Sequence, residues 1–137
     1  MNSRQELAVE LANSVPSGCW VSYGDIGDAL KYLTGTGNGR GVAVTLTALL
    51  DDVTTWHRIR DAEGRWRGHQ HIDPVPEGSH QVSKDGGYIV GDPSDAYNVS
   101  LAGEGVPIST TGCAAESHRL NLVAALRDGT IVPTKAR

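Results

Sequence analysis

A glycine-rich run at residues 34–41, TGTGNGRG, interrupts a long stretch of helix-like sequence. Before it, Ser22 and Asp25 form a Ser-x-x-Asp box that predicts a helix through Leu33. The apolar residues of that helix share one face: Ile26, Ala29, Leu30 and Leu33. After it, a helix is predicted over 39–50, with an apolar face of Val42, Leu46, Leu49 and Leu50. Two short helices around a tight turn predict a helix-turn-helix unit.

Three further segments complete the predicted elements. Ser3 and Glu6 form another capping box, which predicts a helix over 3–14 that ends before Pro16. The stretch WHRIR-DAEG-RW, residues 56–66, predicts a β-hairpin around the turn DAEG. A last helix is predicted over 114–127, ending at Gly129, with an inward face of Leu120, Val123 and Leu126.

These elements predict an α+β fold in one domain over 1–137. Residues 1–67 would form a winged helix-turn-helix core, with the hairpin as the wing. Residues 68–112 are rich in Gly, Pro, Asp and Ser, and predict a loop-rich insertion with short β-like pieces only at 88–90 and 106–108. Residues 113–137 would form the C-terminal helix and tail.

Composition limits the partners that we expect. The net charge of −4 argues mildly against nucleic acid, although four arginines lie close together at Arg58, Arg60, Arg65 and Arg67. The charged N-terminal segment predicts neither a signal peptide nor a membrane span. Cys19 and Cys113 are far apart in sequence, and we expect two reduced thiols rather than a disulfide in a cytoplasmic protein.

Three fragments resemble one known family in order and spacing. VPSGCWVSYGDIGDAL, GRGVAVTL and WHRIRDAEGRW are similar to the DNA-binding domain of the O6-alkylguanine-DNA alkyltransferases. The resemblance covers about residues 4–67, with a weaker echo in the last helix. It is strongest to the alkyltransferase-like proteins, the non-catalytic branch in which Trp replaces the acceptor cysteine. In this chain Trp56 stands at that position, and Thr55 replaces the proline that usually precedes it.

The resemblance implies a role for each matching residue. Tyr23 is similar to the tyrosine that crowds a DNA phosphate and helps to rotate a nucleotide out of the stack. Arg40 is similar to the arginine finger that fills the vacated space. The implied lesion pocket contains Trp56, His57, Arg58 and Tyr23. The implied DNA-binding residues are Tyr23, Arg40, Ser22, Gly39 and Gly41.

The physical chemistry agrees with those roles. Extruding a base costs a few kcal/mol, and a guanidinium that stacks in the gap offsets part of that cost. Glycines let backbone approach DNA closely, and amides at a helix N-terminus bind phosphate. Trp56 has no nucleophile, so we expect a modified guanine to be held without alkyl transfer, against the indole as an open wall. The alternatives are that Trp56 is core and that His57 is structural.

The expected function is therefore the binding of double-stranded DNA and the flagging of a modified base for a repair partner. We expect a monomer without a cofactor, and no enzyme activity. An alternative is a protein-interaction module that keeps the fold without binding DNA, which the acidic insertion and net charge favour. A third is a metal-dependent enzyme that uses alternating ligands, His69, His71 and Asp73, with His80 nearby.

Overall fold

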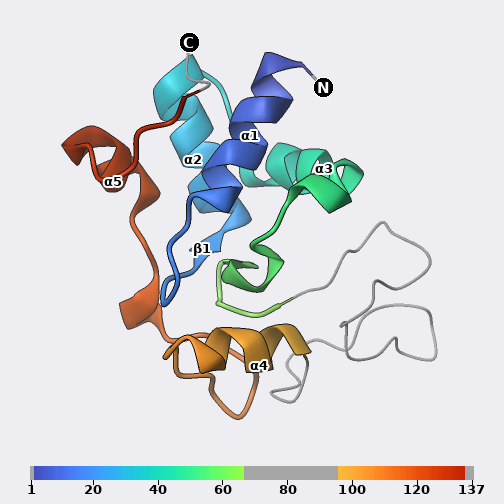
Figure 1. Ribbon diagram of the computed structural model, residues 1–137, viewed down its shortest axis with the longest axis vertical. Coiled ribbons are helices and arrows are strands. Elements are labelled where there is room, and N and C mark those ends of the chain that lie inside the picture. Colours follow the sequence, from blue (N-terminus) through green and yellow to red (C-terminus); the bar gives the residue numbers. More distant parts are fainter. Residues whose placement is uncertain (1, 67–95, 135–137) are drawn as a thin grey trace.

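The computed structural model describes residues 2–66 and 96–134, and shows a helix-rich α+β fold (Figure 1). Its α-helices are α1 Ser3–Asn13, α2 Tyr23–Thr34, α3 Gly39–Ala48, α4 Ala96–Gly103 and α5 Leu122–Asp128. Strands β1 Val21–Ser22 and β2 Ile59–Arg60 are accompanied by short 3-10 helices, η1 Leu50–Asp52, η2 Trp56–Arg58 and η3 Glu116–His118. Within these ranges, no helix has the length and apolar character needed to cross a bilayer.

The first three predicted helices are confirmed to within two residues at each end. The first one is capped one residue earlier than expected: Asn2 accepts from the Gln5 amide at 2.8 Å, and the Gln5 side chain accepts from the Asn2 amide at 2.9 Å. The box of Ser22 and Asp25 forms as predicted at the start of α2. Gly35 ends α2 with φ of 92°, a left-handed conformation that glycine adopts readily.

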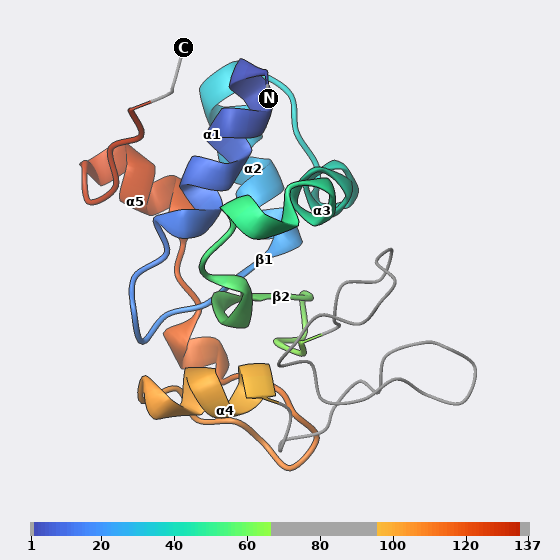
Figure 2. The same cartoon turned by 45° about the vertical axis from the view of Figure 1, so that its right-hand side comes forward.

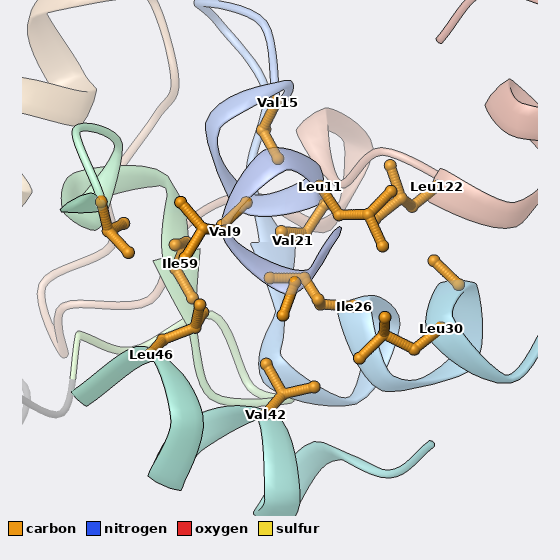
Figure 3. Packing of buried hydrophobic residues seen from close by; sticks show 14 of the residues in the cluster. Val9, Leu11, Val15, Val21, Ile26, Leu30, Val42, Leu46, Ile59 and Leu122 are labelled. Carbon is orange, nitrogen blue, oxygen red and sulfur yellow. The ribbon is translucent and has the colours of Figure 1, made fainter. Parts of the chain in front are cut away.

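A single apolar cluster joins these helices to the strands. The interior is filled by aliphatic side chains from α1, α2, α3 and β2, among which Leu11, Ile26, Leu46 and Ile59 have no exposed surface (Figure 3). A second, smaller cluster forms around Trp20, with Leu101, Val106 and Ala114. This second cluster attaches α4 to the segment that leads into β1.

The hairpin predicted over residues 56–66 is wrong. Trp56–Arg58 form the short helix η2, and β2 pairs in parallel with β1, Val21 with Ile59 and Ser22 with Arg60. Arg65 forms its bridge with Cys113 instead. Only the DAEG turn is confirmed, since Asp61 accepts from the Gly64 amide at 3.0 Å. The Asp61 amide also donates to the Arg65 carbonyl at 3.0 Å, but no antiparallel strand pair forms within residues 56–66, because the strand and bridge partners of Ile59, Arg60 and Arg65 lie elsewhere in the chain.

Two further predictions need correction in the C-terminal third. The predicted insertion contains a helix, α4, whose sequence AYNVSLAG has weak helical propensity; burial of Asn98 and Leu101 stabilises it instead. The last helix begins at Leu122 rather than at 114, with Asn121 as its cap. Residues 118–120 instead bond to Trp20, whose amide donates to the His118 carbonyl and whose carbonyl accepts from the Leu120 amide. The predicted stop at Gly129 is confirmed.

Candidate functional site

The first turns of α2 and α3 pack directly against each other. Gly24 and Gly39 meet at this contact: a Cβ added to Gly39 would lie 2.9 Å from the Cα and the nitrogen of Gly24. Only glycine allows two helices to approach so closely. The contact places Tyr23, the first residue of α2, and Arg40, the second residue of α3, on neighbouring turns. We call this junction the α2–α3 corner.

Tyr23 lies half-buried at this corner and packs against the core. Burial raises the pKa of its hydroxyl above the ordinary value, so the group is neutral and can donate a hydrogen bond at physiological pH. In the part of the chain that the structure describes, that hydroxyl has no hydrogen-bond partner. A phenol held in this way is suited to an acceptor from outside the protein, such as a phosphate oxygen.

Arg40 is exposed and lies on the first turn of α3, close to where the sequence predicted the start of a helix. Its guanidinium forms neither a hydrogen bond nor an ion pair within residues 2–66 and 96–134. The cap of the helix is Asn38, whose side chain accepts from the Gly41 amide at 2.7 Å. Gly41 is exposed beside the arginine, and Gly39 is half-buried in the contact with α2. The corner therefore presents a cation that no described side chain neutralises.

Ser22, expected to contact DNA, is buried and forms hydrogen bonds within the protein. It is 2 % exposed, and its hydroxyl accepts from the Asp25 amide and from Arg119 Nη2 at 3.0 and 3.1 Å. Arg119 also holds both carboxylate oxygens of Asp25, at 2.8 and 3.0 Å, and its guanidinium lies 5.2 Å above the Trp20 ring. Asp25 raises the pKa of Arg119, which stays charged. This group fixes the N-terminus of α2 to the chain before α5.

Trp56 lies in the core and is 7 % exposed. Its indole N–H donates to the Leu50 carbonyl at 3.1 Å, and the ring meets Trp66 edge-on, with centroids 6.4 Å apart. Trp66 in turn stacks on Tyr97 of α4, with centroids 4.1 Å apart. In this structure the indole is therefore packed against other side chains rather than presented as the open wall that the sequence led us to expect.

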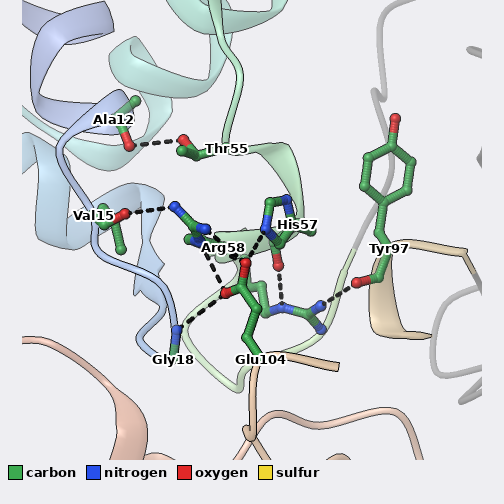
Figure 4. Close-up of polar contacts among 9 residues, drawn as sticks. Ala12, Val15, Gly18, Thr55, His57, Arg58, Tyr97 and Glu104 are labelled. Atoms are coloured by element: carbon green, nitrogen blue, oxygen red, sulfur yellow. Dashed lines mark hydrogen bonds and ion pairs between the residues drawn. The ribbon is translucent and has the colours of Figure 1, made fainter. Parts of the chain in front are cut away.

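His57 and Arg58 hold one carboxylate, that of Glu104, immediately after α4 (Figure 4). His57 Nε2 lies 2.8 Å from Glu104 Oε2, and Arg58 Nη2 lies 2.6 Å from the same oxygen. Glu104 also accepts from the Gly18 amide at 3.1 Å, and Arg58 donates to the Val15 carbonyl at 2.8 Å. Chiefly through its bonds to Arg58, the carboxyl keeps a pKa of about 2. We call this group the Glu104 clamp; it supports the structural alternative for His57.

The sequence also predicted a metal site as an alternative and two reduced cysteines. His69, His71, Asp73 and His80 lie outside the described residues. Within residues 2–66 and 96–134, no group of three or more His, Cys, Asp or Glu residues is placed to hold a metal ion. Cys19 and Cys113 are both free thiols and half-buried.

Glu104, Arg119 and the packing glycines of α2 were not recognised from the sequence. Glu104 pairs with Arg58, 46 positions away, and Arg119 pairs with Asp25, 94 positions away. No local sequence pattern predicts contacts over such separations. The glycines did carry a signal: Gly24 and Gly27 are three residues apart and so share a helix face. A Cβ added to Gly27 would lie 2.5 Å from the carbonyl carbon of Asn38. Gly24 and Gly27 therefore form the surface of α2 against which the start of α3 packs.

Comparison with known proteins adds no relative: no family model, curated protein or solved structure matches this chain.

Proposed function

We propose that this protein binds double-stranded DNA through the α2–α3 corner and probes for a modified base with Arg40. One observation supports this above the others: Arg40 is an exposed cation without a described partner, on a helix turn that packs onto the turn bearing Tyr23. The resemblance of residues 4–67 to the alkyltransferase-like proteins points to the same two side chains.

The chemistry of the corner suits a phosphate backbone. The neutral Tyr23 hydroxyl is a donor, and amides in the first turns of α2 and α3 add positive potential. Because Gly39 and Gly41 lack side chains, a DNA strand can approach the α3 backbone beside Arg40. A guanidinium at this point can enter the stack and pair with the base left without a partner.

The resemblance of residues 4–67 to the alkyltransferase-like proteins supports O6-alkylguanine as the modified base. Trp56 is packed in the core, so an extruded base reaches the indole only after the side chains that cover it move. With tryptophan at the acceptor position we propose binding without alkyl transfer, which flags the base for repair.

The test compares two labelled duplexes that are identical except for one O6-methylguanine. We expect fluorescence anisotropy at low salt to show tighter binding of the modified duplex, by about tenfold or more. Replacing Arg40 with alanine should remove that preference and cost about 1–3 kcal/mol of binding to the modified duplex. Arg127→Ala is the matched control, because Arg127 is an exposed arginine on α5. Helices α5 and α3 lie on opposite sides of the molecule in Figure 2.

Three results would overturn parts of the proposal. Equal affinity for both duplexes across a salt series would remove base recognition, and unchanged binding by Arg40→Ala would remove the corner as the contact. Binding to neither duplex would leave the protein-interaction module as the better account, consistent with the net charge of −4.

A further inference from the structure

A polar cleft lies between the N-terminal turns of α1 and α3, apart from Tyr23 and the Glu104 clamp. It has a volume of about 220 Å³. Its polar lining comes from the capping residues of two helices, Asn2, Gln5 and Asn38, from Arg4, and from Thr45 within α3, while Ala8, Leu30 and Val42 add apolar surface. Because a water molecule takes up roughly 30 Å³, the cleft has room for a group several times larger.

The hydrogen bonds of the caps determine which atoms remain for a ligand. Each of the three amide side chains uses its oxygen to accept from a backbone amide: Asn2 from Gln5, Gln5 from Asn2, and Asn38 from Gly41. Their NH₂ groups make no hydrogen bond within residues 2–66 and 96–134. The side-chain oxygens of the three amides are therefore used in capping, and their NH₂ groups remain for a ligand. These NH₂ groups can only donate hydrogen bonds.

The charge of the lining agrees with the donors. Arg4 is the cation, and two of its bonds hold it over the α2–α3 turn, to the Thr34 hydroxyl at 3.0 Å and to the Thr36 carbonyl at 2.8 Å. Among the described residues that line the cleft, none is acidic, although the whole chain carries a net charge of −4. A cation and unused donors without a carboxylate favour an oxyanion over a cation or a neutral ligand.

We infer that this cleft binds a phosphate group. Two sources supply that chemistry: a backbone phosphate of DNA, or a free phosphate compound. The first source would extend the proposed DNA contact, because Gly41 lines the cleft and follows Arg40 directly in the chain. The inference itself stands on the cleft and does not need DNA binding.

The decisive variant is Gln5→Glu, because it changes one atom of the cleft and preserves the cap. Glutamate at this position still accepts from the Asn2 amide, as in an ordinary capping box. The free NH₂ group becomes a carboxylate oxygen, which repels an anion. Arg4 is a poorer choice for substitution, since its bonds to Thr34 and Thr36 also hold the turn. Asn38→Asp is a second variant of the same design, since aspartate remains a good cap of α3.

The experiment titrates inorganic phosphate into the full ¹⁵N-labelled chain at neutral pH, with sodium chloride keeping the ionic strength constant. We expect the amide signals of Gly41 and Thr45 to shift and saturate. In Gln5→Glu and in Asn38→Asp the midpoint should rise by about tenfold or more. Arg127→Ala changes the net charge by the same amount away from the cleft and should titrate like the wild type. No saturation in the wild type, or unchanged midpoints in both carboxylate variants, would overturn the inference.

A second experiment, with DNA, distinguishes a backbone phosphate from a free phosphate compound. If a backbone phosphate occupies the cleft, Gln5→Glu lowers the slope of log K against log salt for a plain duplex by about one. If that slope is unchanged while the phosphate titration is lost, the ligand is a free phosphate compound. A wild type that binds phosphate but no duplex contradicts the proposed function and leaves the cleft assignment supported.

Discussion

Single side chains far apart in the sequence hold this molecule together at two points. Arg119 joins the start of α2 to the chain before α5 through Asp25. Glu104 joins α4 to η2 and to the turn at Gly18. The Glu104 carboxylate is 16 % exposed, so it depends on these donors in place of water.

Removing the charge of Glu104 should destabilise the fold. We expect Glu104→Gln to lower the free energy of unfolding at neutral pH by about 2 kcal/mol, because the half-buried Arg58 loses its charged partner. Urea unfolding followed by circular dichroism measures this. Glu63→Gln is the control: Glu63 is 68 % exposed and 3.7 Å from Arg65, so its loss should cost roughly 0.5 kcal/mol or less.

The same variant should show a defined pH dependence. The pKa of Glu104 falls from its ordinary 4.5 to about 2 on folding, so its contribution is complete above the higher value and is lost as pH falls toward the lower one. The difference in unfolding free energy between wild type and Glu104→Gln should therefore shrink from about pH 5 to pH 2. A difference that stays constant over this range would contradict the assignment of the clamp.

At the scale of elements, the pairing of α2 with α3 depends on Gly27. We expect Gly27→Ala to destabilise the protein by about 1–3 kcal/mol, because its Cβ would meet the Asn38 backbone, which cannot rotate away as a side chain can. Thermal unfolding measures the loss. Gly103→Ala in α4 is the control, since a Cβ there meets nothing within 4 Å; equal effects of the two substitutions would refute the close contact.

Local signals predicted some elements well and others poorly. The helices before and after the glycine-rich run have caps and apolar faces in their own sequence, and α2 ends at a glycine in the left-handed conformation. The helices between residues 3 and 48 were therefore predictable. The hairpin failed because β2 pairs with β1, some forty residues earlier in the chain, and Arg65 with Cys113. The short helix α4 was missed because its stability comes from burial of Leu101 and Asn98 rather than from propensity.

In the candidate site, too, some residues were predictable from local sequence and others were not. The position of Arg40 at the start of a helix was predictable from the glycine-rich run around it. Burial of Trp56 did not, because it depends on Trp66 and on the chain around Leu50, whose positions no local pattern specifies. The partner of His57 and Arg58 was equally invisible, since Glu104 lies after a helix that the sequence did not predict.

At the scale of the whole molecule, charge is distributed unevenly. The chain has a net charge of −4, yet the α2–α3 corner and the cleft beside it present Arg40, Arg4 and unused donors. An acidic protein with a local basic face should bind DNA weakly overall and lose affinity steeply with added salt.

Extrusion of a base by Arg40 is the central claim, and 2-aminopurine beside an O6-methylguanine in a duplex tests it most directly. Its emission rises when neighbouring bases unstack. At saturating protein, we expect the wild type to raise the emission and Arg40→Ala to leave it at the level of free duplex. An equal rise with Arg40→Ala, or no rise with saturating wild type, would contradict the account.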